Sequence, residues 1–417
     1  MKNNRHMELM SNLIESISMG PFGSDVKVEY FTEKGIPFLS GENLTSIKMN
    51  DRNLKYFPEE KAEKLSKAIV YPGDIVVTHR GTLGQLSYVP DDLKEKRFLI
   101  SQSQFKVTLK KDLVNPVWFA YYFHTKEGQK RLLSFANYVG VPALATATTN
   151  FKGLEIPLPK RAEQDKIADF LSNIDSKIAN NNAISKELES TAKTIYDYWF
   201  LQFEFPDKDG KPYKSSGGKM VWNDQLKQEI PEGWEVGTLD QLFRITMGTS
   251  PQGNTLNTKG VGVEFYQGST DFGNIYPTPR VYTTDSKKTA EAQDILLSVR
   301  APVGALNLAL NNCSIGRGLA SIHFERSTIF AWNKMNSLKG YFDVFNGNGT
   351  TFGSLTGEMI NKLVTVIPSN KVIEAYTEET KAIEEKLRSI QLENQELKSL
   401  RDFLLPMLMN GQVTIKD

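Results

Sequence analysis

The sequence predicts an α+β protein with two strand-rich domains in tandem repeat and two long helices that form an antiparallel coiled coil. Three observations support this prediction. A twelve-residue pattern occurs twice in the chain. Each copy lies in a strand-rich segment that is followed by a long helical segment. Apolar residues in both helical segments recur at alternating steps of three and four residues.

The repeated pattern is "GDIVVTHRGTLG" at 73–84 and "QDILLSVRAPVG" at 293–304. Both copies place an aspartate before three aliphatic residues, followed by an arginine and a final glycine. A buried strand that ends in a turn is typical of such a pattern. The aspartates are Asp74 and Asp294, the arginines Arg80 and Arg300, and the glycines Gly84 and Gly304.

The likeness between the two copies extends beyond this pattern. "SISMGPFGS" at 16–24 matches "RITMGTSPQ" at 244–252, and "IPFLSGENL" at 36–44 matches "VEFYQGSTD" at 263–271. The separation of equivalent residues changes along the chain, as expected of two old copies with different loop insertions. The chain is therefore interpreted as a tandem duplication.

The predicted order of segments is a strand-rich domain, a helical spacer, a linker, a second strand-rich domain, and a second helix with the C-terminal tail. Their expected bounds are 1–155, 156–204, 205–231, 232–368 and 369–417. Proline closes the last strand of each domain, and polar residues lead into each helix. The linker is rich in Lys, Gly, Ser and Pro, which indicates a surface connection.

The three- and four-residue steps of both helices are the heptad pattern of a coiled coil. We assign to the seam Ile174, Ile178, Leu188 and Ile195 in the first helix, and Ile383, Leu387, Ile390, Leu397 and Leu404 in the second. Ser185 and Asn394 fall at matching seam positions, where coiled coils place polar residues that set the register. The first helix leads from the first domain toward the second, so a pairing second helix must run back. The alternative is that each helix packs only on its own strand-rich domain.

An aromatic cluster lies at the end of the first helix. It consists of Tyr196, Tyr198, Trp199 and Phe200. Together with the apolar seam faces, we expect it to be a surface for partner proteins that is exposed in the isolated chain.

Composition limits the possible functions of the 417 residues. The 50 basic and 49 acidic residues give a net charge of +1, so any contact with nucleic acid must be local or shared with partners. No apolar run approaches the roughly 18 residues of a membrane span. The N-terminus lacks the features of a signal peptide, and Cys313 is the only cysteine, so we expect a reducing cytoplasm.

The usual signals of catalysis are missing from the sequence. The four histidines, His6, His79, His124 and His323, lack the spacing of a zinc site. "PDKDGK" at 206–211 places its two acidic residues in one tight turn, whereas a nuclease metal site draws its acids from separate strands. "GNGTTFG" at 347–353 does not follow the glycine order of a dinucleotide-binding turn. We therefore expect no catalytic residue, metal or cofactor on this chain.

Four stretches resemble the specificity subunit of Type I restriction-modification systems. They are "IPLPKRAEQDKIADFLSNIDSKI" at 156–178, "YDYWFLQFEFPDKDGKPYKSSGGKMV" at 196–221, "IPEGWEVGTL" at 230–239 and "ENQELKSLRDFLLPMLMNGQVTI" at 393–415. The resemblance spans nearly the whole chain. It implies a non-catalytic subunit in which the two strand-rich domains are target-recognition domains, each reading one half of a bipartite, asymmetric site in double-stranded DNA.

The same resemblance implies the partners of the chain. The helices would set the spacer between the half-sites and dock two methyltransferase subunits, which use S-adenosylmethionine to methylate adenine. Restriction subunits would join the full complex and use ATP and Mg²⁺. The second helix begins "PSNKVIEAYTEE" and lacks the "EQDKIA" element of the first, a difference that bears on the second methyltransferase contact.

Two other functions stay open at this point. One is a free-standing, sequence-specific DNA-binding regulator built from the same modules. The other is a self-contained nuclease or methyltransferase.

Arg80 and Arg300 follow a strand at a turn, where a guanidinium can reach guanine or a phosphate. Alternatively, each arginine braces its own loop by bonding to Asp74 or Asp294 or to nearby carbonyls. The same arginine in two domains that read different sequences favours a common structural or phosphate role. Residues that read bases should differ between the copies; the candidates are Ser40, Glu42, Asn43, His79, Gln102 and Gln104 in the first, and Gln267, Ser269, Asp271, Arg317, Asn348 and Thr350 in the second.

Overall fold

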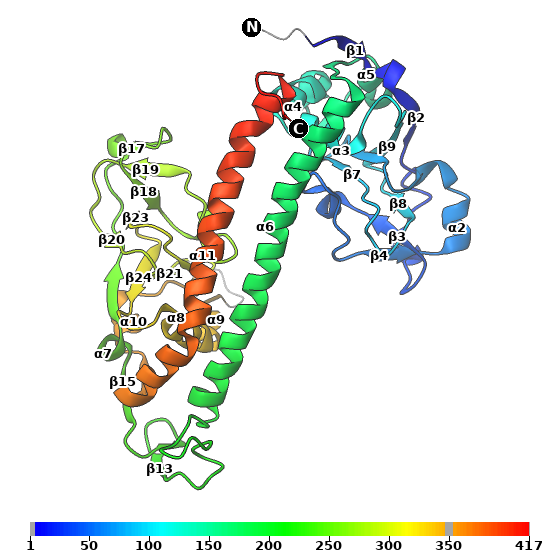
Figure 1. Ribbon diagram of the computed structural model, residues 1–417. Coiled ribbons are helices and arrows are strands. Elements are labelled where there is room, and N and C mark those ends of the chain that lie inside the picture. Colours follow the sequence, from blue (N-terminus) through cyan, green and yellow to red (C-terminus); the bar gives the residue numbers. More distant parts are fainter. Residues whose placement is uncertain (1–4, 347–352, 417) are drawn as a thin grey trace. The chain divides into compact units, whose positions relative to one another are not determined.

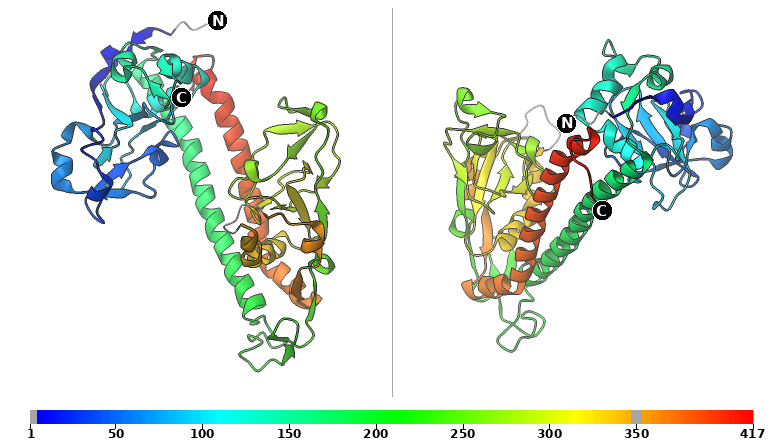
Figure 2. Two further views of the ribbon diagram at one scale, coloured as in Figure 1. Left: turned by 180° about the vertical axis from the view of Figure 1, so that it is seen from behind. Right: turned by 45° about the horizontal axis from the view of Figure 1, so that its top comes forward.

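The structure is a computed structural model that describes residues 5–346 and 353–416. The chain divides into two compact units. Unit 1 consists of residues 1–180 and 393–417, and unit 2 of residues 181–392. In Figure 1 the strand-rich part of unit 1 is coloured blue to cyan and that of unit 2 green to yellow, and Figure 2 shows both from other sides.

Two four-stranded sheets form the strand-rich part of unit 1. The first sheet has the order β2-β9-β6-β7 and is antiparallel, with strands β2 (Ile14–Met19), β9 (Gln104–Leu109), β6 (Ile75–Thr78) and β7 (Leu86–Tyr88). The second has the order β4-β3-β8-β5, with strands β4 (Lys55–Phe57), β3 (Ile36–Leu39), β8 (Phe98–Ile100) and β5 (Ile69–Val70). In this second sheet β3 and β8 are parallel.

Short strand pairs and helices complete unit 1. The pairs are β1 (Met7–Leu9) with β12 (Glu155–Pro157) and β10 (Ala136–Asn137) with β11 (Ala143–Leu144). The short helices are α1 (Met10–Leu13), α2 (Glu59–Glu63), α3 (Pro116–Phe123), α4 (Lys126–Leu132) and α5 (Ala147–Lys152). Four 3₁₀ turns lie among them: η1 (Val28–Tyr30), η2 (Gly41–Leu44), η3 (Ser66–Ala68) and η4 (Leu133–Phe135).

Unit 2 repeats this topology, with one additional strand, β17, at the edge of its second sheet. Its first sheet has the order β16-β24-β21-β22, with strands β16 (Arg244–Met247), β24 (Leu319–His323), β21 (Ile295–Ser298) and β22 (Leu306–Leu308). Its second has the order β17-β19-β18-β23-β20, with strands β17 (Leu256–Asn257), β19 (Val281–Thr283), β18 (Val263–Tyr266), β23 (Cys313–Ile315) and β20 (Thr289–Ala290). Here β18 and β23 are parallel, as β3 and β8 are in unit 1. The predicted duplication of the fold is confirmed.

The remaining elements of unit 2 also have counterparts in unit 1. Strand β15 (Glu235–Thr238) pairs with β25 (Val364–Ile367), as β1 does with β12. The short helices are α7 (Leu239–Leu242), α8 (Thr328–Ser337), α9 (Lys339–Asp343) and α10 (Gly357–Asn361), with the 3₁₀ turns η6 (Gly253–Thr255), η7 (Ser269–Asp271) and η8 (Val344–Asn346). The linker, which the sequence predicts as a surface connection, contains a hairpin of β13 (Met220–Asn223) and β14 (Gln228–Pro231).

Each central strand is buried on both faces, which explains its uninterrupted aliphatic run. In β6, Ile75 and Val77 belong to the core that includes α3, whereas Val76 belongs to the core of the second sheet. In β21, Leu297 and Leu296 divide in the same way between two cores. The repeated pattern in the sequence is therefore a strand placed between two apolar layers.

Two long helices follow the strand-rich parts. Helix α6 (Arg161–Tyr196) contains 36 residues and continues into the π-helical turn η5 (Asp197–Leu201), and helix α11 (Asn370–Met409) contains 40 residues. Each helix contributes one part to unit 1 and one part to unit 2. Within residues 5–346 and 353–416, no helix is both long and apolar enough to span a bilayer.

The two helices pair antiparallel inside each unit. In unit 1, Arg401 donates to Asp175 (Nη1 to Oδ1, 2.7 Å), and Lys177 pairs with Glu393 (Nζ to Oε1, 3.3 Å). In unit 2, the Tyr376 hydroxyl donates to the Ala192 carbonyl at 3.2 Å. From Asp175 through Lys177 to Ala192, the contacting position on α11 falls from Arg401 through Glu393 to Tyr376. The predicted antiparallel pair is confirmed, and packing on the strand-rich domains alone does not describe the helices.

The seam positions lie inside this packing. Ile174, Ile178, Ser185 and Ile390 are buried, and Leu188, Ile195, Ile383, Leu387, Leu397 and Leu404 are half-buried. Asn394 is also buried. These residues therefore face neighbouring parts of the protein, as a heptad seam does.

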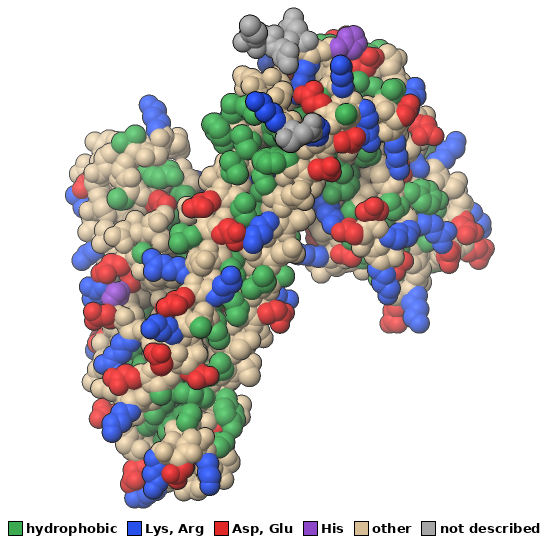
Figure 3. Space-filling model, viewed as in Figure 1, with side chains coloured by type: hydrophobic (Ala, Val, Ile, Leu, Met, Phe, Trp, Pro, Cys, Tyr) green, Lys and Arg blue, Asp and Glu red, His purple; other side chains and the backbone are tan. Residues whose placement is uncertain are grey.

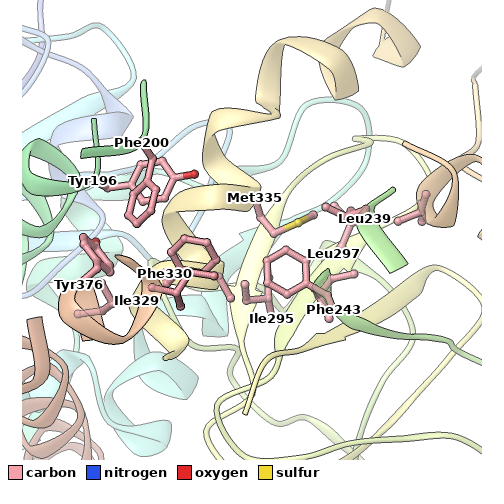
Figure 4. Close-up of a cluster of buried hydrophobic side chains, with 14 of the residues drawn as sticks. Tyr196, Phe200, Leu239, Phe243, Ile295, Leu297, Ile329, Phe330, Met335 and Tyr376 are labelled. Atoms are coloured by element: carbon pink, nitrogen blue, oxygen red, sulfur yellow. The ribbon is translucent and has the colours of Figure 1, made fainter. Parts of the chain in front are cut away.

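The aromatic residues at the end of α6 do not form an exposed surface, in contrast to the sequence-based expectation. Tyr196, Trp199 and Phe200 are buried in the core of unit 2, and only Tyr198 is exposed. Figure 4 shows Tyr196 and Phe200 beside Tyr376, and the rings of Phe200 and Tyr376 are 5.1 Å apart. Hydrophobicity in the sequence cannot distinguish a core of the chain from a partner surface, and here the core uses these side chains.

Candidate nucleic-acid interface

The aspartate of each repeated pattern holds the turn that leads into the central strand. Asp74 accepts a hydrogen bond from the Tyr71 amide at 2.9 Å and another from the Thr108 hydroxyl at 2.6 Å. Asp294 accepts from the Glu291 amide at 2.9 Å, also three residues upstream. Ser321 and His323 of β24 donate to Asp294 as well. Both carboxylates are buried and fully occupied by the framework.

The glycine of each pattern allows the turn that follows the strand. Gly84 has φ +90° and Gly304 has φ +85°, a backbone conformation that favours glycine. Space is a second constraint, because a Cβ on Gly304 would lie 2.4 Å from Cβ of Phe342. The aspartate and the glycine therefore fix the two ends of one strand and turn in both units.

The arginine of each pattern lies between these fixed points and is exposed. Within the described part of the chain, neither Arg80 nor Arg300 makes a side-chain hydrogen bond or ion pair. The interpretation that they brace their loops through Asp74 or Asp294 is wrong, since other groups occupy both carboxylates. Two exposed guanidinium groups at equivalent turns are available to an anion such as a DNA phosphate, or to a guanine edge.

Three loops of unit 1 meet around the Arg80 turn. The His79 amide donates to the Ser103 carbonyl at 2.9 Å, which joins this turn to the turn between β8 and β9. Gln85 donates to the Gly41 carbonyl at 3.1 Å and accepts from the Thr78 hydroxyl at 3.0 Å, which joins the same turn to η2. Loops from three parts of the sequence thus form one continuous surface.

The equivalent loops of unit 2 meet in the same way. The Val299 amide donates to the Gly318 carbonyl at 2.9 Å, and the Gly318 amide donates to the Gln267 carbonyl at 3.1 Å. The Ser250 hydroxyl donates to the Gln267 side chain at 2.8 Å. The turns that carry Arg300, Arg317 and Gln267 are therefore neighbours, as in unit 1.

The repeated Met-Gly pairs have a steric explanation. A Cβ on Gly20 would lie 2.0 Å from the Ser101 carbonyl oxygen, and a Cβ on Gly248 would lie 2.2 Å from the Gly316 carbonyl oxygen. Contacts this short with backbone atoms do not occur, so each position requires glycine. The glycines let the loop after the first strand lie directly against the turn that follows β8 or β23.

The predicted base-contacting residues of unit 1 divide into an exposed and a buried group. Glu42 and Gln102 are exposed, and Ser40 is half-buried at the start of η2. Asn43 is only 2% exposed and donates to the carbonyls of Asn50 and Arg52, while Gln104 is 1% exposed and accepts from the Ser101 amide. The prediction that Asn43 and Gln104 contact bases is not supported, because their side chains hold their own loops.

His79 is half-buried and donates through Nε2 to the Gln102 carbonyl at 3.0 Å. Burial lowers the pKa of His79, and the positive charge of Arg80 lowers it further. The ring is therefore neutral near pH 7, and its other nitrogen can accept a hydrogen bond. This arrangement suits His79 to contact a donor on a base edge, but not to bind a phosphate by charge.

In unit 2, Gln267 and Arg317 are exposed at adjoining turns, and Ser269 is half-buried at the start of η7. Asp271 forms an ion pair with Arg280, so its charge is balanced inside the unit. Asn348 and Thr350 lie outside the described residues. Gln267 and Arg317 are therefore the predicted residues of unit 2 with accessible side chains for a ligand.

Two further residues near these surfaces are not among the predicted site residues. The first is Gln164, which is fully buried: it accepts from the Asn115 amide at 2.8 Å and donates to the carbonyls of Leu113 and Pro159. The second is Phe22, whose ring is 83% exposed in the loop after β2. A buried glutamine carries no signal in a single sequence, whereas an aromatic residue inside "GPFGS" could have been noticed, because turns seldom expose such a ring.

The electrostatics of the surface follow the balanced composition. On the face drawn in Figure 3, basic and acidic side chains are interspersed over both units. Among the described residues, the structure contains no cluster of three or more His, Cys, Asp or Glu that could hold a metal ion. Arg80, Arg300 and Arg317 are exposed cations in the loops of the candidate interface.

The chain is similar in sequence to specificity subunits of type I restriction enzymes. A family profile described as the Type I restriction modification DNA specificity domain matches residues 29–190. A putative type I restriction enzyme MjaX specificity subunit from Methanocaldococcus jannaschii is 29% identical over 389 residues, which cover 92% of this chain and 88% of the relative. The MjaIX specificity subunit from the same organism is 25% identical over 94% of this chain and 90% of the relative.

A solved structure shows the same fold. The S subunit of a Type-I restriction-modification system from M. genitalium has a TM-score of 0.57 to this chain, with 17% identity. The match covers 97% of this chain and 96% of the other. The chain is thus similar to specificity subunits of type I restriction enzymes in sequence, and to an S subunit of such a system in fold.

Proposed function

We propose that this chain is the non-catalytic subunit that recognises DNA sequence in a type I restriction-modification complex. Each strand-rich domain reads one half of a bipartite, asymmetric site. The observation that supports this proposal most directly is the duplicated loop surface: both units present an exposed arginine on the same framework, but different side chains surround it. Two domains that recognise different half-sites need the same framework but different loops.

The two arginines have a common role in this proposal. Phosphates are present at every position of a duplex, so a residue that binds them can be identical in two readers. Arg80 and Arg300 fit this role, because each is exposed and without a side-chain partner among the described residues. Sequence would then be read by the side chains that differ, which include Gln102 and His79 in unit 1 and Gln267 and Arg317 in unit 2.

The long helices would bind the partner subunits and set the distance between the half-sites. We place two methyltransferase subunits on α6 and α11 and give these helices the role of setting the spacer between the half-sites. No cofactor is assigned to this chain; S-adenosylmethionine would belong to the methyltransferase subunits, and ATP with Mg²⁺ to the restriction subunits. The complex would act in the cytoplasm, where the DNA is.

An insertion tests the role of the helices in spacing. Four residues added near Ser185 lengthen α6 by about one turn, or roughly 6 Å, and a coiled coil can absorb such an insertion by local unwinding. Because one base pair occupies about 3.4 Å, the spacer in an active insertion variant should lengthen by one or two base pairs. Long-read methylation sequencing measures this directly. An unchanged spacer in an active variant would contradict the proposal.

The alternative function, a free-standing DNA-binding regulator, makes a different prediction. Size-exclusion chromatography and DNA-binding titrations can compare the chain alone with the chain plus its methyltransferase subunit. We expect a stable complex whose affinity for the specific site exceeds that of the isolated chain. Tight, specific binding by a monodisperse isolated chain that forms no such complex would favour the regulator.

A further inference from the structure

The loop after β2 carries an aromatic ring that folding does not use. Phe22 is 83% exposed, whereas most large apolar side chains of unit 1 belong to its two cores. The turn around it is ordered by a hydrogen bond from the Asp25 amide to the Phe22 carbonyl at 2.9 Å. The ring is therefore held outside the core on a defined turn.

This turn lies against the candidate DNA surface of unit 1. The Gly20 amide donates to the Gln104 carbonyl at 2.8 Å, and a Cβ on Gly23 would lie 2.4 Å from Oε1 of Gln102. Phe22 lies between these two contacts with the turn at 101–104. The same turn accepts the hydrogen bonds of His79, so Phe22 belongs to a continuous surface with His79 and Gln102.

Unit 2 has a different side chain at the equivalent place. The pairing of Gly20 with Gly248 puts Ser250 opposite Phe22. Ser250 is committed to its own unit, since its hydroxyl donates to Gln267 and accepts from the Arg317 amide at 3.4 Å. In unit 2 the residue at this position therefore holds two loops together, whereas in unit 1 it leaves an apolar ring exposed on the loop surface.

We propose that Phe22 is a specificity-determining residue of unit 1 that contacts the 5-methyl group of a thymine in the major groove. This inference rests on the proposed function. A phenyl ring offers no hydrogen bond, and the apolar feature that a base pair presents in the major groove is the thymine methyl. Arg80 is exposed and has no side-chain partner among the described residues, so it can bind a phosphate of the DNA backbone beside that thymine. The surface thus combines an apolar contact, polar base readers and a phosphate ligand.

Deoxyuridine substitution tests the contact, because deoxyuridine differs from thymidine only by that methyl group. The experiment uses the complex of the full chain with its methyltransferase subunits and a duplex that carries the site mapped by methylation sequencing. Each thymine of both half-sites is replaced in turn. One replacement in one half-site should weaken binding by the wild-type complex about fourfold, the effect of one buried methyl-sized group.

Variants of Phe22 complete the test. F22S should bind the unmodified site about fourfold more weakly and should no longer distinguish thymine from deoxyuridine at that position, whereas F22L should still distinguish them. Replacements in the other half-site should affect wild type and F22S equally. Val28 is 86% exposed in η1, so V28S is a matched control that should behave as wild type. The melting temperature of F22S should be unchanged, because the ring is outside the core.

Three results would overturn the inference while the proposed function stands: no deoxyuridine weakens specific binding by the wild-type complex, F22S discriminates as wild type does, or F22S impairs only assembly with the methyltransferase. The last result would make Phe22 a protein contact. A wild-type complex that cannot distinguish its mapped site from unrelated DNA would instead contradict the proposed function itself.

Discussion

The two units share a framework and differ in what holds their loops. In both, a buried aspartate orders the turn before the central strand, and a glycine orders the turn after it. In unit 1 the turn after β3 is closed by Asn43, whose side chain accepts from the amide of Ser40, the N-cap of η2, and donates to two carbonyls of its own loop. In unit 2 the equivalent turn is held by the ion pair of Asp271 with Arg280. Loops can therefore change while the central strands beneath them keep their pairing.

A second difference concerns how the long helices are attached. In unit 1, Gln164 and Asp165 at the start of α6 bind Asn115, the N-cap of α3. In unit 2, Glu384 of α11 accepts hydrogen bonds from Ser327, the N-cap of α8, and from the next two amides. The "EQDKIA" element therefore anchors α6 within its own unit, and a carboxylate further along α11 performs this task in unit 2.

The largest effect is expected from the shared glycines. G20A and G248A each force a Cβ into a backbone oxygen, which should destabilise the affected unit by about 1–3 kcal/mol and abolish recognition by its loops. Thermal denaturation and methylation of the mapped site measure the two effects.

Gly253 supplies the control for these variants. A Cβ at Gly253 meets nothing within 4 Å, so G253A should leave stability nearly unchanged. If G20A behaves like G253A, the close approach of the loop to the turn at 101–104 is not required.

The next effect tests the different anchors of the helices. Q164A leaves the Asn115 amide without its partner, and E384A removes the acceptor of three donors at the start of α8. Each should lower the free energy of unfolding by about 1–3 kcal/mol, since both anchors satisfy donors that would otherwise lose their partners. Chemical denaturation measures the loss.

Lys186 is exposed on α6, and K186A is the matched control for both variants. If Q164A preserves stability but prevents assembly with the methyltransferase, then "EQDKIA" is a partner contact and not an anchor.

A smaller effect is expected from R80A and R300A. Since neither side chain has a partner among the described residues, stability should change by less than about 0.5 kcal/mol. DNA affinity should fall about tenfold, as for the loss of a charge-assisted hydrogen bond, and the slope of log K against log salt should decrease by about 1.

The half-site sequences should stay the same in both arginine variants. K34A, at an exposed lysine outside the loop surface, should not change the salt slope. A relaxed preference at one base pair, with an unchanged salt slope, would show that the arginine reads a base.

The smallest effect concerns a feature of unit 2. Glu189 lines an apolar cavity with Ile275, Leu308, Trp332 and Leu387, and its Oε1 is buried without a hydrogen-bond partner. Burial raises the pKa of Glu189 to about 7 from 4.5. The folded state therefore keeps a proton that the unfolded state releases above pH 4.5, and stability falls as pH rises toward and through 7.

E189Q removes this titration. The free energy of unfolding of E189Q minus that of wild type should be larger at pH 8 than at pH 5, by the order of 1 kcal/mol. Thermal denaturation at the two pH values measures it, with E187Q, an exposed position on the same helix, as control. Equal behaviour of E189Q and E187Q would show that the carboxyl of Glu189 is well solvated.

Periodicity and internal repetition were sufficient to predict much of the fold. The run Ile75–Val77 and its counterpart Ile295–Leu297 predicted buried strands because three aliphatic residues before a turn need two apolar layers. The heptad steps predicted paired helices for the same reason. Periodicity could not show that Tyr196, Trp199 and Phe200 pack in the core of unit 2, since a core and a partner surface have the same composition.

The candidate interface was predictable only where the two copies could be aligned. The shared Asp, Arg and Gly marked one turn in each unit, but polarity could not separate accessible side chains from those that hold loops. Asn43 and Gln104 are buried because carbonyls and amides of neighbouring turns surround them. Such contacts depend on how distant loops meet, and a single sequence contains no record of that.

In the proposed function, each unit reads its own half-site. Replacing residues 8–155 with the equivalent domain of a relative of different specificity tests it most directly, with long-read methylation sequencing of cells that express the hybrid and its methyltransferase. One half-site should take the sequence read by the relative, and the other should stay as in wild type. A change in both half-sites, or in neither while methylation persists, would contradict it.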